Sequence, residues 1–283
     1  MSVIFTVFAG RKGNLKLLFD YVNDLLDKGS ITEFHVWNYT RDEIVDEPWL
    51  KNNLRKDPRV KLFEVENKKT WDEYYAYYTP DKFAPDDVII KSDDDIVFID
   101  TEQFDSFIAR RRKMDKFTLF FPSIVNNGVC VHAQREFGLL DPKEFTDDNA
   151  TAIWTNATVG EFLHQTFINN FDKFIEKSRK DGPNFPVHTN FAPHESVINI
   201  NFFAILGKDL DIFQKTVGKP NDEQFLGRSG VHYIDMSMVV SHLAFAPQRA
   251  DGFNNELFQI KYRLLKEKFA SKVRNGGSDC PDD

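Results

Sequence analysis

The chain has 283 residues, and its 41% hydrophobic content suffices for a sizeable core in one large domain or two small ones. With a formal net charge of −8 it lacks the basic surface that neutralises nucleic-acid phosphates, so we expect no nucleic-acid partner. No run of about 18 apolar residues occurs, so we expect no transmembrane helix. The two cysteines lie far apart, and residues 3–8 lack the basic flank of a signal peptide. These features predict a cytoplasmic protein with reduced thiols.

The first third of the chain alternates short apolar runs with helical patterns. Strands are predicted at residues 3–8, 32–37, 60–65 and 88–91, and helices at 15–26 and 71–78. This alternation is typical of an α/β fold with a mixed, mostly parallel sheet flanked by helices.

The second part of the chain is less regular. Its predicted elements are helices at 158–177 and 253–272 and strands at 197–206 and 236–245. No linker or repeat separates the two parts, so we expect one two-part domain over residues 1–270, followed by a flexible tail at 271–283. The basic run at 110–113 is interpreted as a solvated helix end.

Three adjacent aspartates, Asp93, Asp94 and Asp95, stand between two apolar runs. Such carboxylates repel one another and lose hydration, so a fold accepts them only beside a cation. In an extended segment Asp93 and Asp95 project to one side and Asp94 to the other. Two carboxylates at a strand end can hold a hard divalent cation, and open α/β sheets bind ligands at strand ends. The alternative is a solvated loop that caps a helix beginning near Thr101.

The segment from Lys91 to Asp95 resembles the Asp-X-Asp motif of GT-A type glycosyltransferases, which use nucleotide sugars. The resemblance implies a GT-A (Rossmann-like) domain with a nucleotide-sugar-binding half at residues 1–122 and an acceptor half at 123–270. It also implies Mn²⁺ or Mg²⁺ that bridges the two phosphates of the donor. Asp95 would bind the metal directly, Asp93 would contact the metal or the ribose, and Asp94 would lie near the sugar.

Further donor-site candidates follow the first two predicted strands. Gly10 lets the backbone approach a ligand and Arg11 can pair with a phosphate, although an ordinary turn with a surface arginine remains an alternative. The rings of Trp71 and Tyr74 can stack on a base or can be plain core. The predicted donor-binding residues are Ala9, Gly10, Arg11, Asn38, Tyr39, Trp71, Tyr74, Lys91, Asp93, Asp94 and Arg249.

A histidine from the C-terminal part of the domain is a further metal ligand in many GT-A enzymes. The resemblance assigns this role to His242, with His232 as the alternative, and imidazole suits Mn²⁺. A lone histidine in an apolar run can also be an ordinary core residue. The predicted metal ligands are therefore Asp93, Asp95 and His242, with Gln248 and Arg249 close enough in sequence to reach the diphosphate.

Inverting enzymes of this type often place a Glu-Asp pair between the metal aspartates and this histidine, and one carboxylate of the pair acts as the general base. Here the order is reversed, as Asp222 and Glu223, and Glu195 is another candidate base. Asp222 can instead cap a short helix. The segment 126–128, Asn-Asn-Gly, is either a tight turn or a loop that contacts the sugar.

Taken together, the resemblance implies a metal-dependent enzyme that transfers a sugar from a nucleotide diphosphate sugar to a hydroxyl of a glycan or other acceptor. UDP is the commonest donor nucleotide with this motif, and inversion at the anomeric carbon is favoured. One alternative is a nucleotidyltransferase that makes the activated sugar, for which residues 9–13 are a sparse version of the glycine-rich loop. The other is a non-catalytic carbohydrate-binding protein in which the aspartates are structural.

Overall fold

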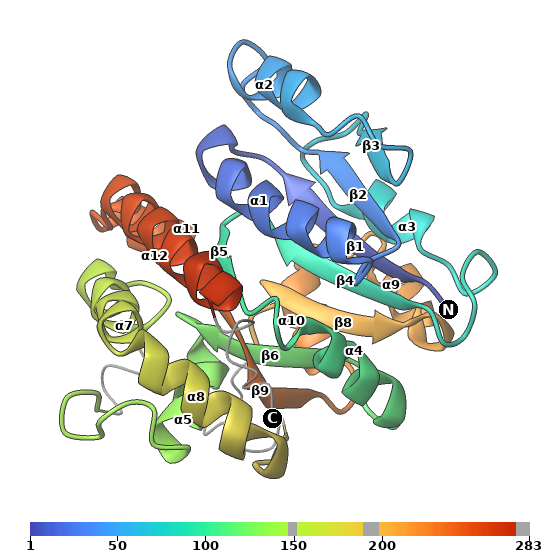
Figure 1. The fold of residues 1–283 in the computed structure, drawn as a ribbon. Coiled ribbons are helices and arrows are strands. Elements are labelled where there is room, and N and C mark those ends of the chain that lie inside the picture. The colour runs from blue at the N-terminus through green and yellow to red at the C-terminus, as the bar shows by residue number, and fades with distance from the viewer. Residues whose placement is uncertain (147–151, 189–197, 276–283) are drawn as a thin grey trace, which may run out of the picture.

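A computed structural model describes residues 1–146, 152–188 and 198–275 of the chain (Figure 1). The first part contains β1 (Val3–Ala9), α1 (Lys12–Lys28), β2 (Glu33–Asn38), α2 (Asp46–Asn53), β3 (Val60–Glu64), α3 (Asp72–Tyr77) and β4 (Val88–Asp93). The middle contains β5 (Ile96–Ile99), α4 (Phe104–Lys113), β6 (Phe120–Val125), α5 (Gly128–Glu136), α7 (Ala157–Asn169), α8 (Phe171–Asp181), η1 (Gly182–Asn184) and β7 (Val187–His188). The last part contains β8 (Phe202–Leu206), η3 (Gly207–Asp209), α9 (Asp211–Thr216), α10 (Asp222–Arg228), β9 (Tyr233–His242), α11 (Ala246–Ala250) and α12 (Asn255–Asn275).

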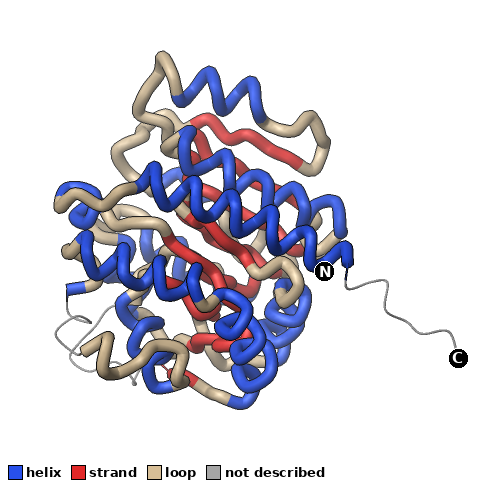
Figure 2. Tube along the Cα trace, turned by 60° about the vertical axis from the view of Figure 1, so that its left-hand side comes forward, coloured by secondary structure: helices blue, strands red, loops and turns tan. Residues whose placement is uncertain are grey.

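These strands form one mixed sheet with helices along its outside, which confirms the predicted α/β class (Figure 2). The strand order is β3-β2-β1-β4-β8-β6-β9-β5, and β7 pairs with β9. The first four strands are parallel, as is the β6–β9 pair. In contrast, β8 runs antiparallel to β4 and β6, and β5 and β7 run antiparallel to β9. The sheet is therefore mostly parallel in its first half only.

β1 and the start of β4 are apolar because both faces of the sheet are covered there. All seven residues of β1 are buried, as are the apolar residues at the start of β4. β4 continues to Asp93, so the acidic triplet begins inside the strand. Asp94 and Asp95 then form a tight turn into β5, so they do not cap the helix expected near Thr101, which is α4 and begins at Phe104.

Several predicted boundaries differ from the structure. The helix expected at 158–177 is interrupted at Asn170, whose φ of −107° and ψ of 22° separate α7 from α8. The strand expected at 197–206 occupies only β8, and β9 begins three residues before the predicted 236. α12 continues to Asn275, past residue 270, where we expected the tail to begin; residues 276–283 lie outside the described part.

The basic run at 110–113 forms the last turn of α4, as predicted, but the prediction that it is solvated was wrong for its first two residues. Arg110 pairs through Nε with the buried Asp235 at 2.6 Å. Arg111 is fully buried, and its Nη2 lies 3.0 Å from Asp209. These ion pairs connect α4 to β9 and to η3.

The aromatic residues of α3 pack into the core of the first half. The ring of Trp37 on β2 stacks on Phe63 with a centroid distance of 4.5 Å, and Tyr74, Tyr77 and Tyr78 surround this pair. In the described segments, no helix has both the length and the apolar composition needed to cross a membrane.

Candidate functional site

A cavity of about 640 Å³, which we call the central cavity, opens in the described part of the molecule. It lies where β1, β2 and β4 end, which is the edge at which open α/β sheets place their ligands. Its lining includes Gly10, Arg11, Tyr39, Trp71, Lys91, Asp93, Asp94, Asp95, Asp222, Glu223 and Arg249, all of which were predicted site residues.

The three aspartates occupy different positions on the cavity floor. Asp93, at the end of β4, forms an ion pair with Lys91 and accepts a 3.1 Å hydrogen bond from Asn201 Nδ2. Asp94 accepts a 3.1 Å hydrogen bond from the backbone N–H of Gly10, so β1 and β4 are connected at this point. The backbone carbonyl of Asp95 accepts from the N–H of Leu243 at 2.8 Å, which places the end of β9 beside the triplet.

Two arginines balance the buried charge of the triplet. Arg11 forms ion pairs with Asp94 and Asp95, the latter at 2.8 Å, and Arg249 Nη1 lies 3.4 Å from Asp95. Burial raises the pKa of Asp94 even though Arg11 opposes the change. Burial acts in the same direction on Asp95, but His242, Arg11 and Arg249 outweigh it and hold the pKa of Asp95 well below its usual range. Asp95 is therefore an ionised carboxylate at neutral pH.

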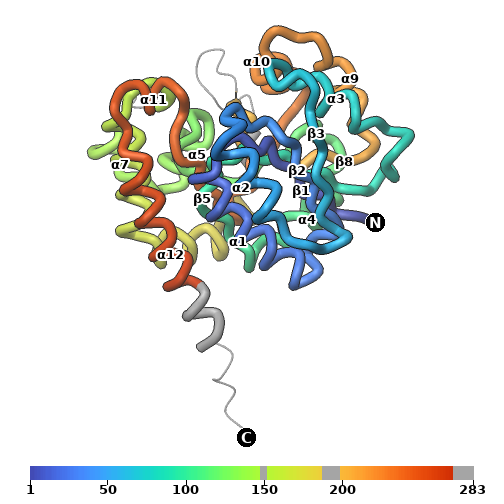
Figure 3. Tube along the Cα trace, turned by 90° about the horizontal axis from the view of Figure 1, so that it is seen from above, coloured from blue at the N-terminus to red at the C-terminus, as the bar shows by residue number. Residues whose placement is uncertain are grey.

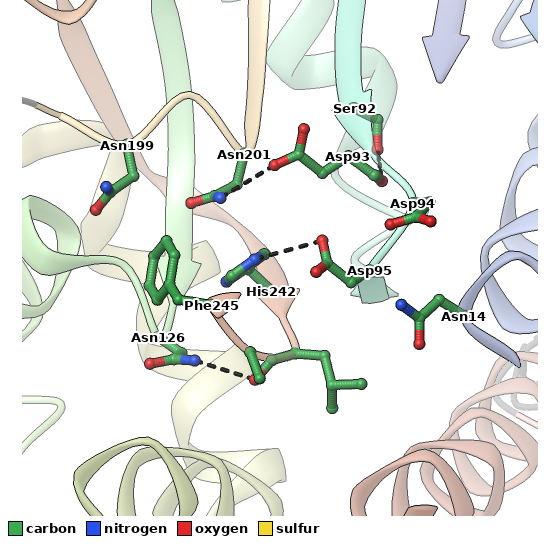
Figure 4. Close-up of polar contacts among 12 residues, drawn as sticks. Asn14, Ser92, Asp93, Asp94, Asp95, Asn126, Asn199, Asn201, His242 and Phe245 are labelled. Carbon is green, nitrogen blue, oxygen red and sulfur yellow. Dashed lines mark hydrogen bonds and ion pairs between the residues drawn. The ribbon is translucent and has the colours of Figure 1, made fainter. Parts of the chain in front are cut away.

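Asp93, Asp95 and His242 together have the geometry of a metal site (Figure 4). One ligand atom from each lies within 4.8 Å of the others, and His242 Nε2 is 3.3 Å from Asp95 Oδ1. Among the described residues, Asp95 Oδ1 and His242 Nδ1 are buried without a hydrogen-bond partner. Both arginines bind Asp95 through Oδ2, whereas Oδ1 faces His242 Nε2 at 3.3 Å. Two carboxylates and an imidazole are a donor set that fits Mn²⁺.

The other candidate ligand, His232, lies elsewhere. It is fully buried, it packs against the ring of Phe121 at 5.8 Å, and it is not part of the Asp93–Asp95–His242 group. Gln248 is also committed to the core, because its side-chain amide exchanges hydrogen bonds of 2.9 and 3.0 Å with Asn126. Gln248 is fully buried there and does not line the cavity.

Three predicted donor-site residues lie behind the cavity wall. Ala9 is fully buried in β1. Asn38 donates a 2.7 Å hydrogen bond to Glu64 and accepts from Thr40, so its side chain fixes the end of β2. The Tyr74 hydroxyl is 2.8 Å from Thr6 Oγ1 in the core. These side chains shape the wall but do not contribute to its surface.

One wall of the cavity is aromatic. Phe8, Tyr39 and Trp71 contact one another with ring centroids 4.8 to 5.3 Å apart, and all three line the hollow. The hydroxyl of Tyr39 is buried and has no hydrogen-bond partner in the described segments. Phe8 was not predicted as a site residue because it reads as an ordinary interior residue of the first strand.

The acidic pair also lines the cavity, at the start of α10. Asn221 caps this helix by accepting from the N–H of Gln224 at 2.8 Å, so Asp222 is not the cap. Asp222 accepts a 2.7 Å hydrogen bond from Tyr75 and a second one from the N–H of Glu223. Glu223 accepts a 2.7 Å hydrogen bond from Asn199 Nδ2, and burial raises its pKa. Glu195 lies outside the described residues.

An asparagine network connects this acidic wall to the metal-site group. Asn127 is the N-cap of α5, and its Nδ2 lies 3.0 Å from the carbonyl of Asn199 and 3.1 Å from Asn201 Oδ1. Asn199 in turn binds Glu223, and Asn201 binds Asp93. The segment 126–128 is thus a helix-capping turn at the end of β6. The sequence carries no local signal for Asn199 or Asn201, which lie more than a hundred residues from the triplet.

Comparison with known proteins gives limited information. No family model matches the chain, and neither does any curated protein. Among solved structures, the chain is similar to "GalNAc-T7 with UDP, GalNAc and Mn2+", with a TM-score of 0.49 and 12% identity over 87% of this chain. The match covers only 45% of the GalNAc-T7 chain. It is also similar to a 4-diphosphocytidyl-2C-methyl-D-erythritol synthase from Anaerococcus prevotii, with a TM-score of 0.44, 14% identity and coverage of 94% and 98%. Both TM-scores lie below 0.5.

Proposed function

We propose that this protein is a metal-dependent glycosyltransferase that moves a sugar from a nucleotide diphosphate sugar, UDP-linked, to a hydroxyl of a glycan acceptor with inversion. The observation that carries the proposal is the Asp93–Asp95–His242 group, whose two aspartates line the central cavity and whose Asp95 Oδ1 is buried without a hydrogen bond among the described residues. The aromatic wall and the second carboxylate group of the cavity supply the other parts that such a reaction needs.

In this proposal the donor lies between the aromatic wall and the triplet. Phe8, Tyr39 and Trp71 offer a surface on which a base can pack. Asp93, Asp95 and His242 would hold Mn²⁺, which would supply positive charge beside the departing diphosphate. Arg11 and Arg249 already lie at this position and add to that charge, because both line the cavity next to Asp95.

Glu223 is the better general base of the acidic pair. Both oxygens of Asp222 accept hydrogen bonds from the protein, so its carboxylate is held in place as a structural group. Asn199 engages only Oε1 of Glu223 in the described structure, and burial raises the pKa of this carboxyl group. A carboxylate with a raised pKa is a stronger base, so Glu223 is suited to take the proton of the attacking hydroxyl.

The test is an assay with a panel of nucleotide sugars, Mn²⁺ and a mixture of neutral and charged glycans, in which nucleoside diphosphate release is measured. We expect release from one donor, dependent on metal and increased by acceptor, and at least about 10²-fold slower for Asp95→Asn. The matched control Asp20→Asn removes an exposed aspartate of α1 and should behave as wild type. Pyrophosphate release from a nucleoside triphosphate and a sugar phosphate would instead identify a nucleotidyltransferase. Absence of both activities would contradict the proposal.

A further inference from the structure

A second hollow of about 250 Å³ opens beside the central cavity. It lies between residues 69–75, which lead into α3, and residues 216–222, which lead into α10, and we call it the side groove. Figure 3 shows α3, α9 and α10 gathered on this side of the molecule. Trp71 and Asp222 line both hollows, so the side groove is continuous with the central cavity at these two residues.

The walls of the side groove are joined by hydrogen bonds. The N–H of Gly218 donates to Asp72 Oδ1 at 2.7 Å, and the Tyr75 hydroxyl donates to Asp222 at 2.7 Å. Gln214 adds a 3.0 Å hydrogen bond to the carbonyl of Tyr75. The groove is therefore built into the fold, and its two carboxylates already have partners.

The lysines of the side groove, in contrast to its carboxylates, have no such hydrogen-bond partners in the described residues. Lys69 and Lys219 line opposite walls and are exposed. In the described part of the chain, neither ammonium group forms an ion pair or hydrogen bond, and Lys219 lies only over the ring of Phe225, at 5.2 Å. In the central cavity, by contrast, Arg11 and Lys91 are paired with the aspartates. Of the described cations that line the central cavity Arg41 is also unpaired, but in the side groove both lining cations, Lys69 and Lys219, are unpaired, and the triplet does not line that groove.

We propose that the side groove binds the acceptor, and that this acceptor carries an anionic group (a carboxylate, sulfate or phosphate) that lies between Lys69 and Lys219. This inference rests on the proposed glycosyl transfer. An acceptor sugar in the groove contacts Trp71 and Asp222 and extends its hydroxyl to Glu223, which follows Asp222 at the start of α10. Its anionic group then remains on the far side of Trp71, away from the repulsion of the triplet.

The experiment uses the fluorescently labelled full chain, Mn²⁺ and the nucleoside diphosphate that stabilises it most, on an array of glycans. Each neutral glycan is matched with uronate, sulfated and phosphorylated counterparts, so the three arms identify the anion. We expect wild type to bind one anionic class about tenfold more tightly than the neutral parent. The double variant Lys69→Glu/Lys219→Glu should lose this preference, whereas Lys16→Glu, an exposed lysine of α1, should keep it.

The inference is overturned if no anionic glycan binds, if neutral glycans bind equally well, or if the double variant keeps the preference. Nucleotide affinity is measured in parallel by thermal shift. If the double variant loses that affinity, the lysines bind the donor and the assignment to the acceptor is wrong. If wild type shows no metal-dependent nucleotide shift at all, the proposed transfer itself fails, and this result is distinct from a loss of anion preference.

Discussion

Two runs of like charge are at least partly buried in this protein, and their charges are balanced differently. The aspartates at 93–95 face a cavity of about 640 Å³, and one oxygen of Asp95 has no hydrogen bond there. Arg110 and Arg111 instead pair with Asp235 and Asp209, which join neighbouring elements. Both runs contain a buried atom without a hydrogen bond among the described residues, Asp95 Oδ1 and Arg111 Nε, but the aspartates line the central cavity. The ion pairs of the two arginines hold neighbouring elements together.

The largest expected effect concerns the acidic pair Asp222–Glu223 of the central cavity. Glu223→Gln should lower kcat by about 10²–10⁴-fold, because the amide cannot accept the proton of the attacking hydroxyl. Metal-dependent nucleotide binding, followed by thermal shift, should be retained. Asp222→Asn is the matched control, and it should cost less than about tenfold because both oxygens of Asp222 serve structural hydrogen bonds. Equal losses for the two variants would contradict the assignment of the base.

Loss of the ion pair between Arg110 and Asp235 should lower the stability of the fold and leave ligand binding unchanged. Asp235→Asn leaves Arg110 without its counter-charge, so we expect the free energy of unfolding in urea to fall by about 2–3 kcal/mol. The Arg110 side chain is 22% exposed, which places the expected loss below that for a fully buried pair. Nucleotide binding by the folded variant should not change. A loss below about 0.5 kcal/mol would show that this pair contributes little to the fold.

Buried histidines extend the comparison to pH. Burial lowers the pKa of His232 to about 4, whereas an unfolded chain binds this proton near pH 6.5. The contribution of His232 to stability is therefore complete above pH 6.5 and is lost as the pH falls towards 4, with about 2 kcal/mol lost at pH 5. His35 and His164 shift in the same direction. Unfolding free energies of wild type and His232→Gln at pH 7 and pH 5 isolate this one group; identical pH dependences would contradict the prediction.

A smaller effect is expected from the residue that orients Glu223. Asn199→Ala removes the 2.7 Å hydrogen bond to this carboxylate, and we expect kcat to fall about tenfold while KM for the donor is unchanged. Asn221→Ala is the control, because it removes the cap of α10 without a direct contact to Glu223. A rise in donor KM for Asn199→Ala would indicate a role in nucleotide binding instead.

The sequence predicted the parallel half of the fold better than the mixed half. Strands buried on both faces give short apolar runs that are readable locally, and β1, β2, β3 and β4 lie close to their predicted positions. The antiparallel neighbours of β8 and β9 depend on pairing between distant segments, for which no local pattern exists. For the same reason, the antiparallel strand directions in the second half of the sheet were not predicted.

For the site, the sequence predicted the residues with a recognisable pattern. The aspartate triplet, His242 and the pair Asp222–Glu223 are adjacent in the structure, although they come from three separate segments. Phe8 was missed because a phenylalanine at a strand end looks like core. Asn199 and Asn201 were missed because they meet their partners only in three dimensions. Of the predicted candidates, Asn38 and Tyr74 proved to lie behind the cavity wall because their side chains bind within the core.

The most direct test of the account is nucleotide binding at the aspartates 93–95. Thermal unfolding of wild type, Asp95→Asn and the control Asp20→Asn is measured with UDP, GDP, CDP and dTDP, each with and without Mn²⁺. At a hundred times its dissociation constant a ligand stabilises the folded state by about 2.7 kcal/mol. The account predicts that one nucleotide, UDP, stabilises wild type and Asp20→Asn only when Mn²⁺ is present, and that Asp95→Asn loses the effect. If no nucleotide stabilises wild type, or if Asp95→Asn responds as strongly, the assignment of this cluster as a metal-dependent donor site is contradicted.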